Sequence, residues 1–411
     1  MIPLLPLYKE RWNVASETAI KPGLQAMKEG LARLGHPEQR LACVHVAGTN
    51  GKGSTVTFLE EMLLAHGLSV GKFMSPCIVD VHDQIQVDGV PISEGEMDAV
   101  FSHMQQSDVS GLLTDFELLT CAAFTHFANE EVDIVLLEAG MGGREDSTNV
   151  IEPVVSIIPS IALEHTNFLG NTLTSIASHK AGIIKYRKPV VTGRLPEEAM
   201  AVVAAEAKQQ QAPLLVLGNH FNVDGETYTS RVYNVELAQL KRALVGPHQG
   251  DNMALALTAF FYIAQQMELE IDAQLLRHAV SVTTVPGRFE QVLPNVYFDG
   301  AHNPASADML AKTITEQFAG KRVEIVFGML ADKDIAAVLQ LLQPHAEKFY
   351  FINIDNERAM DAKEVQKLAV GIESEVVTDS LPLLYAAAQD DVIRIVTGSL
   401  YLLTDIRQQL R

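Results

Sequence analysis

Short runs of apolar residues recur along the first two thirds of the chain, and each leads into a loop and a stretch with helical spacing. These runs lie at 41–47, 69–74, 132–138, 154–161, 188–192 and 213–217. Continuous apolar runs of this length are typical of strands that are buried on both faces. Their alternation with helices predicts a mainly parallel sheet that is covered by helices on both sides.

This alternation is interrupted at 284–290, where the segment TVPGRFE brings proline and glycine together. Beyond the break the pattern resumes, with apolar runs at 295–299, 322–328, 348–354 and 391–397. A chain of 411 residues is too long for one ordinary core. We therefore predict two α/β domains, a large one over residues 1–285 and a smaller, Rossmann-like one over residues 286–411.

Helical spacing of apolar residues predicts helices at 16–35, 54–66 and 172–184. The second of these segments follows a glycine-rich loop, VAGTNGKGS, which spans residues 46–54 and begins where the first strand ends. A strand, a glycine loop and a helix in this order present backbone N–H groups and the positive end of the helix to an anion. The segment therefore predicts a phosphate-binding loop in the first domain, of the P-loop type.

The details of the loop indicate how a nucleoside triphosphate would be held. Lys52 would bridge the outer phosphates, and the hydroxyl of Ser54 or Thr55 could reach a magnesium ion. The match to GxxxxGK[ST] is imperfect, because Val46 stands where the first glycine is expected and Gly53 separates Lys52 from Ser54. The alternative interpretation is a tight turn with a surface lysine.

Two further strands end in side chains that suit a metal ion. Glu138 ends the run 132–138, at the sheet edge where ligands of open parallel sheets bind. A carboxylate there suits Mg²⁺, which prefers hard oxygen ligands, although an ion pair with Arg144 would also explain it. Glu164 and His165 follow another strand, and this histidine is either a metal ligand or simply hydrogen-bonded.

The predicted helix 172–184 carries a lysine on its apolar face. Leu173, Ile176 and Ala177 form one stripe, and Lys180 falls on it because it lies seven residues after Leu173. In one interpretation the aliphatic stem packs and the ammonium group reaches solvent. In the other, a buried lysine loses its proton easily, reacts with carbon dioxide and provides a carbamate oxygen for a second cation.

Three polar residues cluster at the start of the second domain. Arg288 lies at the domain break, and Asp299 and His302 lie at the end of the first strand beyond it. An arginine at this position could neutralise phosphates in a phosphoryl transfer.

Charge and cysteine content narrow the classes of function. The net charge is −20 and the pI about 5.0, which argues against nucleic acid or an anionic membrane as a partner. A polyanionic ligand must therefore be held by local positive groups. The three cysteines match no zinc spacing and predict reduced thiols in the cytoplasm. The N-terminus is a poor signal peptide, and no apolar run reaches the ~18 residues that span a bilayer.

Several segments together resemble folylpolyglutamate synthase/dihydrofolate synthase of the Mur ligase superfamily. They occur in the order found in that family, from about residue 20 to the C-terminus. They are AGTNGKGS, SP (75–76), EAGMGGREDSTNV (138–150), EHTNFLGNT (164–172), HKAGIIK (179–185), PHQGDNMALA (247–256) and PGRFE followed by FDGAHNP.

The resemblance implies an ATP-dependent ligase with a Mur-ligase-like ATP-binding domain and a C-terminal Rossmann-like domain. Such an enzyme activates the carboxylate of a folate or of dihydropteroate as an acyl phosphate, which the amine of L-glutamate then attacks. It uses two Mg²⁺ ions and a carbamylated lysine, and we expect a cytoplasmic monomer.

The resemblance also implies roles for individual residues. Those implied to contact ATP are Asn50, Gly51, Lys52, Gly53, Ser54, Asn252, Arg288, Asp299 and His302. Those implied to hold the metal ions are Ser75 and Glu138 for the first and His165 and carbamylated Lys180 for the second. Those implied to contact the folate are Thr114, Asp115, Phe116, Glu117, Glu145, Asp146 and Ser147. Lys52, Lys180, His165 and Arg288 are the expected catalytic residues.

The chain departs from the family pattern at three positions. Glu164 stands where the family usually has aspartate, His179 where it usually has glutamate, and Glu145 where a bulky apolar residue is frequent. The first two bear on the metal geometry and the third on the pterin contacts.

Three alternatives to the folate ligase stay open. A muramyl ligase carries a further N-terminal domain, for which the 45 residues before the loop leave no room. A P-loop phosphotransferase or NTPase would have a stricter loop motif and would form no amide. A catalytically altered paralogue would bind a folate or a nucleotide without turnover.

Overall fold

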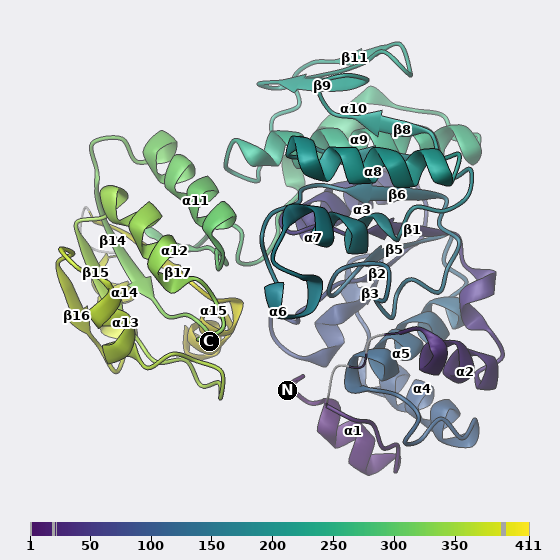
Figure 1. Cartoon of the computed structure of the whole chain (residues 1–411), viewed down its shortest axis with the longest axis horizontal. Helices are drawn as coiled ribbons and strands as arrows, with labels where there is room; N and C mark the ends of the chain where they lie inside the picture. Colours follow the sequence, from purple (N-terminus) through teal and green to yellow (C-terminus); the bar gives the residue numbers. More distant parts are fainter. Residues whose placement is uncertain (1, 19–20, 22, 388–391, 411) are drawn as a thin grey trace. The chain divides into compact units, whose positions relative to one another are not determined.

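The computed structural model describes residues 2–18, 21, 23–387 and 392–410, and these residues fold into two compact units. The first unit comprises the chain up to Arg242 together with Gly250–Thr283, and the second comprises Ala243–Gln249 and the chain from Thr284 onward. The domain boundary expected between residues 285 and 286 stays a prediction. Each unit is built around its own sheet (Figure 1).

Within the described residues, the sheet of the first unit has eight strands in the order β4-β3-β2-β5-β1-β6-β7-β8. The strands are β1 Cys43–Val46, β2 Val70–Phe73, β3 Ile85–Val87, β4 Val90–Pro91, β5 Ile134–Glu138, β6 Val155–Ile158, β7 Val190–Thr192 and β8 Leu214–Val216. The strands from β2 to β8 in this order run parallel, as the apolar runs predicted. The antiparallel β3 and β4 at the edge were not predicted.

Helices cover both faces of this sheet (Figure 1). On one face α3 packs against β2, β5 and α10, and the long helix α9 belongs to the same unit from Gly250 onward. On the other face two apolar clusters hold the remaining large helices to the strands. The helices of the first unit are α1 Leu5–Arg11, α2 Gln25–Arg33, α3 Lys52–Ala65, α4 Glu94–Gln106, α5 Asp115–Asn129, α6 Thr166–Leu169, α7 Leu173–Ala181, α8 Glu197–Gln209, α9 His248–Gln266 and α10 Ala273–Val282.

The first predicted helix, 16–35, was wrong in its N-terminal half. The helix begins only at Gln25, while Glu17 lies in extended chain that pairs with the backbone of Leu113 and Asp115. Gly23 has a φ of 123°, which ends any helical continuation toward the N-terminus. Residues 19, 20 and 22 of this prediction lie outside the described residues. The other two predicted helices exist, as α3 and α7, with slightly shifted ends.

A small antiparallel sheet, also not predicted, joins the first unit after β8. It consists of β9 Phe221–Asp224, β10 Thr227–Ser230 and β11 Val235–Leu237, in the order β11-β10-β9. Its strands are too short and too polar for the apolar-run criterion, since only alternate residues are buried.

The second unit has a mixed sheet in the order β12-β13-β17-β14-β15-β16 within the described residues. The strands are β12 Glu290–Leu293, β13 Val296–Phe298, β14 Arg322–Phe327, β15 Lys348–Phe351, β16 Ser374–Val376 and β17 Val392–Thr397. Its helices are α11 Pro304–Gln317, α12 Ile335–Leu342, α13 Ala362–Leu368, α14 Leu381–Ala387 and α15 Leu400–Leu410. Only β12 is antiparallel to its neighbour, so the predicted Rossmann-like α/β class is confirmed.

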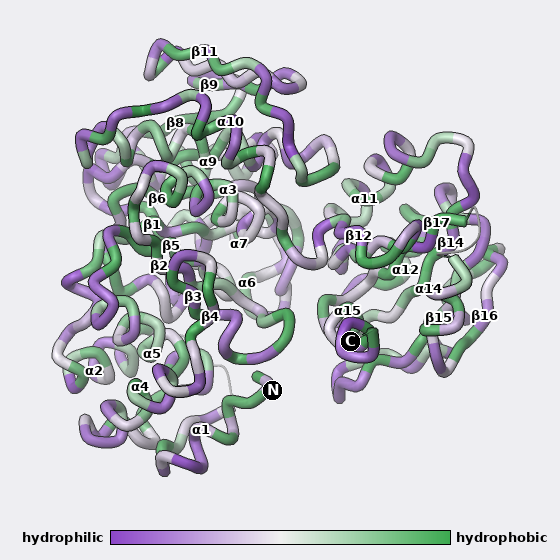
Figure 2. Tube along the Cα trace, turned by 180° about the vertical axis from the view of Figure 1, so that it is seen from behind, coloured by the Kyte–Doolittle hydropathy of each residue, from purple (hydrophilic) through white to green (hydrophobic). Residues whose placement is uncertain are grey.

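Hydropathy follows the layers in both units, because the central strands are apolar and the outer helices alternate between apolar and polar residues (Figure 2). In the part of the chain that the structure describes, no helix combines the length and apolarity that a bilayer crossing requires.

Candidate active site

The glycine loop joins β1 to α3 and leaves the N-terminus of this helix open to an anion. Gly51 is the N-cap residue of α3, with a φ of 84° and no side chain capping the first turn. By contrast, α4, α5 and α11 begin with complete capping boxes. The first N–H groups of a helix lack intrahelical partners, so an uncapped N-terminus is suited to phosphate.

The loop is held closely by its neighbours in the first unit. Asn50 N–H donates to Ser160 Oγ at 2.9 Å, and Thr49 N–H donates to Ser160 O at 2.9 Å. A Cβ atom added to Gly51 would lie 2.4 Å from Asn252 Oδ1, closer than any side chain tolerates. Glycine is therefore required at this position by both its positive φ and the contact with Asn252.

Lys52 reaches back across the loop toward the sheet edge. Its Nζ donates to Gly48 O at 3.1 Å and to Thr49 O at 3.3 Å, and lies 3.6 Å from Glu138 Oε1. The alternative pairing of Glu138 with Arg144 is wrong, because Arg144 forms its ion pair with Glu206 at 2.7 Å. The structure thus brings a buried carboxylate and a lysine together at the phosphate loop.

Strand register places Ser75 at the same edge. Strand β5 lies between β1 and β2, with Val46 opposite Glu138 and Phe73 opposite Leu137. The chain that continues from Phe73 to Ser75 therefore emerges beside Glu138. A Cβ atom on Gly53 would lie 3.2 Å from the methyl of Met74 and 3.6 Å from Glu138 Oε2, which confirms that these segments converge.

The side-chain oxygens of Ser75 and Glu138 are suited to a magnesium ion that also binds phosphate oxygens of a nucleotide. Among the described residues no cluster of three or more His, Cys, Asp and Glu side chains forms a closed metal cage. Mg²⁺ is usually bound by one or two protein oxygens, with water and phosphate oxygens completing the shell. The carboxylate of Glu138, whose Oε1 lies 3.6 Å from Lys52 Nζ, is suited to such an open site.

Lys180 is buried, as its place on the apolar stripe predicted. Its exposed fraction is 2%. The interpretation in which the ammonium group reaches solvent is therefore wrong. The pKa of Lys180 is lowered to about 7, chiefly by burial and also by the nearby charge of Lys52, whereas Glu164 and Asp146 act in the opposite direction.

Glu164 and His165 lie where β6 leads toward α6. His165 is the N-cap residue of α6 with a φ of 51°, and its Nε2 lies 3.9 Å from Glu164 Oε1. Glu164 is buried, and its charge acts on Lys180. Glu164 thus lies close to His165 and acts electrostatically on Lys180, the two predicted ligands of the second cation.

The two segments that the resemblance implies for folate also meet. A Cβ atom on Gly140 would lie 2.7 Å from Phe116 Cζ and 3.5 Å from Asp146 Oδ2. Ser147 Oγ lies 2.7 Å from Thr120 Oγ1, one turn beyond Phe116 on α5. The Phe116 ring packs directly on the backbone of Gly140. This close approach explains why the AGMGG segment has glycine at position 140.

Several of the residues implied for folate already have structural partners. Thr114 and Glu117 form the capping box of α5, with Thr114 N–H donating to Glu117 Oε2 at 2.8 Å. Asp115 accepts from Lys9 Nζ at 2.6 Å and from Ser16 Oγ at 2.5 Å. The buried Asp146 carboxylate accepts from Met141 N–H and from the Thr148 hydroxyl, and burial raises its pKa.

Arg288, Asp299 and His302 lie together in the second unit, as predicted. Asp299 accepts from Phe289 N–H and Ala301 N–H, both at 3.0 Å, and burial raises its pKa while Arg288 opposes the shift. A Cβ atom on Gly300 would lie 2.6 Å from Arg288 Nη1. His302 Nδ1 lies 2.8 Å from Gly300 O. Asn252, by contrast, belongs to the first unit and contacts the glycine loop.

Two residues that support the site through hydrogen bonds were not predicted from the sequence. Ser160 bonds the loop from the segment after β6, and Lys9 of α1 holds Asp115. Ser160 carried a weak signal, since it is a polar residue within an apolar run. Lys9 carried none, because a lysine in an amphipathic helix is ordinarily solvated.

A groove elsewhere in the first unit is separate from these residues. It has a volume of about 790 Å³ and lies between β11, the C-terminal part of α9 and the start of α10. Its lining is mainly apolar and includes Tyr233, Phe261 and Leu269, and none of the predicted site residues contributes to it.

Comparison with known proteins gives matches over both units. The Mur ligase middle domain matches residues 46–260, and the Mur ligase glutamate ligase domain matches residues 287–400. The dihydrofolate synthase/folylpolyglutamate synthase of Bacillus subtilis (strain 168) is 38% identical over 95% of this chain and 96% of its own length. The folylpolyglutamate synthase of Lacticaseibacillus casei is 34% identical over 92% of each chain.

Solved structures match at the level of the whole fold. E. coli FolC in complex with DHPP and ADP has a TM-score of 0.89 and 31% identity, and the match covers 99% of this chain and 97% of that one. The apo form of L. casei FPGS has a TM-score of 0.84 and 31% identity, with 99% of each chain covered.

Proposed function

The chain belongs to the dihydrofolate synthase/folylpolyglutamate synthase family of Mur ligases, and from this premise we propose that it joins L-glutamate to a folate or to dihydropteroate with ATP. The observation that carries the proposal is the convergence of the uncapped N-terminus of α3, Lys52 and Glu138 at one sheet edge. This arrangement suits a triphosphate whose terminal group is to be transferred.

The nucleotide contacts are proposed on the geometry of each unit. The loop from Asn50 to Ser54 receives the phosphates at the α3 N-terminus, and Lys52 neutralises the outer ones. Asn252 orders the loop at Gly51. Arg288, Asp299 and His302 of the second unit are the proposed further contacts of ATP. The ADP bound by E. coli FolC supports this assignment.

The reaction needs an activated acid, because hydroxide is a poor leaving group. A carboxylate oxygen of the acceptor attacks the γ-phosphorus, the bond to the β-phosphate oxygen breaks, and ADP leaves. The amine of glutamate then attacks the acyl carbon, phosphate leaves with its bonding electron pair, and the amine proton passes to a base. Lys52 and Arg288 neutralise the charge spread over the transferring phosphoryl group.

Two Mg²⁺ ions are part of the proposal. Ser75 and Glu138 would hold the first, and His165 and Lys180 the second. Bound Mg²⁺ supplies charge neutralisation and orients the phosphate oxygens. The Glu138 carboxylate is buried and lies 3.6 Å from Lys52 Nζ of the glycine loop. This position is suited to a ligand of the first ion.

Lys180 would serve as a ligand after carbamylation. Its neutral amine forms a bond to the carbon of CO₂ and releases one proton, which leaves an anionic oxygen pair on a side chain that was cationic. A buried lysine with a pKa of about 7 has a substantial neutral fraction under ordinary conditions. The burial of Lys180 beside Glu164 and Asp146 supports this role.

The acceptor site is proposed at the meeting of the two segments around Gly140. Phe116 offers an aromatic face there, and residues 145–147 line the other side. Whether the acceptor is dihydropteroate, a folate or both is decided by experiment. We also propose that the enzyme is a cytoplasmic monomer.

The test is product mass analysis with ATP, Mg²⁺, L-glutamate and each acceptor separately. We expect a product heavier than the acceptor by one glutamate residue, and phosphate release that depends on both the acceptor and glutamate. Phosphate release without any amide product would overturn the proposal in favour of a P-loop NTPase. ATP binding without turnover with any acceptor would indicate an altered paralogue.

A further inference from the structure

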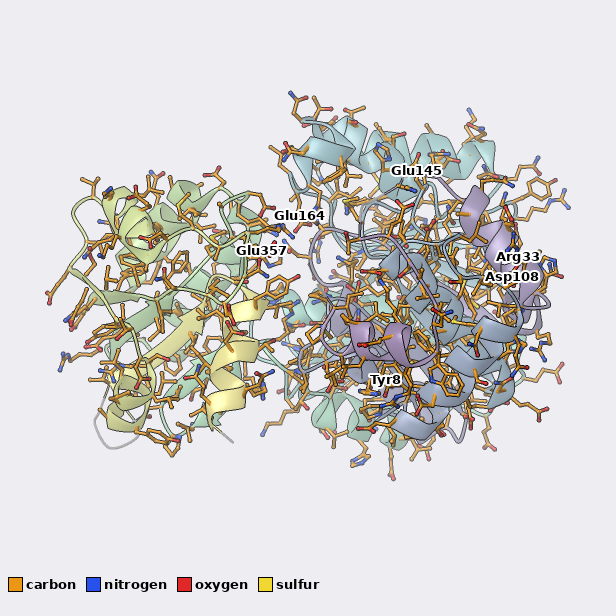
Figure 3. All side chains as sticks on the ribbon, turned by 90° about the horizontal axis from the view of Figure 1, so that it is seen from below. Tyr8, Arg33, Asp108, Glu145, Glu164 and Glu357 are labelled. Carbon is orange, nitrogen blue, oxygen red and sulfur yellow. The ribbon has the colours of Figure 1, made fainter. Side chains whose placement is uncertain are left out.

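Two of the residues that depart from the family pattern are partners in the structure. His179 Nδ1 lies 2.7 Å from Glu145 Oε2, and their side chains are 29% and 38% exposed. His179 lies in the last turn of α7, and Glu145 lies in the loop after β5 (labelled in Figure 3). The two residues lie 34 positions apart in the sequence.

The surrounding contacts hold the backbone of this loop against the end of α7. Arg144 N–H donates to His179 O at 2.7 Å, and Asn149 Nδ2 donates to Gly182 O at 3.2 Å. A Cβ atom on Gly143 would lie 2.9 Å from His179 O, so the two segments touch without an intervening side chain. The Glu145–His179 pair adds to the side-chain contacts of this junction, in which Arg144 also donates to Ser178 O.

Each partner adjoins a residue of the proposed site. Glu145 precedes Asp146 and Ser147, which belong to the proposed acceptor segment, and His179 precedes Lys180. Half-exposed pairs of this kind contribute little to the stability of the fold, so stability does not account for this pair. A contact between these positions instead defines how the acceptor segment lies relative to Lys180.

We propose that Glu145 and His179 are a matched pair of positioning residues that set the acceptor segment 145–147 against α7 and so determine affinity for the folate-class acceptor. This inference rests on the proposed function. Because the two residues act together, each supports acceptor affinity only when the other is present. In the pattern of the resemblance the carboxylate is at 179 and an apolar residue is frequent at 145, whereas in this chain the carboxylate is at 145 and a histidine is at 179.

The experiment compares H179E, E145L and the double variant E145L/H179E. H179E places two carboxylates where the atoms now lie 2.7 Å apart. We expect it to raise the KM of the acceptor about tenfold, with little change in the KM of ATP, because like charges in contact repel each other and displace the acceptor segment. E145L alone should raise the acceptor KM less. The double variant should return it to within about threefold of the wild type.

The control is K312M, which breaks the Lys312–Asp308 ion pair, also 2.7 Å long, in the second unit and should leave the acceptor KM unchanged. Thermal melts and measurements of ATP affinity identify any variant that misfolds. In that case the milder variants E145Q and H179Q are used instead. Effects that multiply independently in the double variant, or an unchanged acceptor KM in H179E, would overturn the pairing. A wild-type protein that forms no amide product would instead overturn the proposed function.

Discussion

At the scale of the residue, Lys180 shows how a position can break the hydrophobic pattern for a chemical reason. It occupies a place on the buried stripe of α7 where an aliphatic residue would pack at no cost. Burying a charged amine is unfavourable and moves its pKa to about 7. Such a cost is expected where the side chain is chemically altered or used.

Replacing Lys180 should separate this cost from the function. K180A and K180M should lower turnover by about 100-fold or more, because a charged ligand of the phosphoryl-transfer site is lost. The melting temperature of K180M should not fall. In K180A a short carboxylate such as acetate should restore part of the turnover by filling the vacated space. Phosphate release and thermal melts measure both effects, and full activity in K180A would exclude the carbamate.

The pH dependence of stability provides a second prediction for Lys180. Between its pKa of about 7 in the folded protein and its ordinary value of 10.5, only the unfolded chain holds the proton. Stability therefore rises with pH across this window, by at most about 1.4 kcal/mol per pH unit from this group, and the contribution is constant below it. K180M should lack this component of the slope.

Urea unfolding of the protein without ligands, in bicarbonate-free buffer at about pH 7.5 and about pH 9.5, measures the difference. Relative to K180M, the wild type should gain about 2–3 kcal/mol between these pH values. K312M, which alters an exposed lysine, is the control and should parallel the wild type. Identical slopes for K180M and the wild type would contradict the burial of a titrating amine.

At the scale of the element, the two ends of α3 illustrate two uses of glycine. Gly51 at the N-cap and Gly67 just after the helix both have positive φ, of 84° and 81°. The space around them differs, since Asn252 crowds Gly51 and nothing lies within 4 Å of an added Cβ at Gly67. Position 67 therefore requires glycine only for its positive φ, whereas position 51 also requires glycine because no side chain fits there.

This difference predicts different outcomes for the same substitution. G67A should lower the free energy of unfolding by about 1 kcal/mol and leave ATP affinity unchanged, because only backbone strain is added. G51A adds a contact at 2.4 Å and should also weaken ATP binding by about tenfold or more. Calorimetric titration with ATP and urea unfolding measure the two quantities. Equal ATP affinities in both variants would mean that the loop does not hold phosphate.

At the scale of the whole molecule, the net negative charge disfavours binding of the proposed anionic substrates. A net charge of −20 repels ATP and an anionic acceptor, so their binding requires local positive groups, for which Lys52 and the α3 N-terminus are the proposed candidates. The Lys52 side chain is only 16% exposed, so salt screens it less than it screens the surface charges.

Adding salt at low ionic strength should therefore increase the rate of ATP capture. Raising it from about 0.02 M to about 0.15 M should increase kcat/KM for ATP two- to threefold, as the repulsive long-range field is screened. Steady-state rates in potassium acetate and in potassium chloride measure this, and agreement between the salts excludes chloride binding in the phosphate loop. A steady fall in kcat/KM with salt would show that attraction dominates.

Much of the architecture was predictable because it follows from local patterns. Each predicted parallel strand is present, and the loop before α3 has its expected place between strand and helix. Errors arose where tertiary pairing overrode periodicity. Glu17 is extended because the backbone at Leu113 and Asp115 pairs with it, and β9–β11 escaped prediction because a half-exposed small sheet has no continuous apolar run.

The sequence by itself determined the fold class, the phosphate loop and the anomaly at Lys180, because strand burial, glycine spacing and helical periodicity are properties of neighbouring residues. Only the tertiary structure decided which charges meet: Glu138 with Lys52 rather than Arg144, and Glu145 with His179. Partners of this kind lie far apart in the chain, and the packing of strands and helices alone sets the few ångströms between their charged atoms.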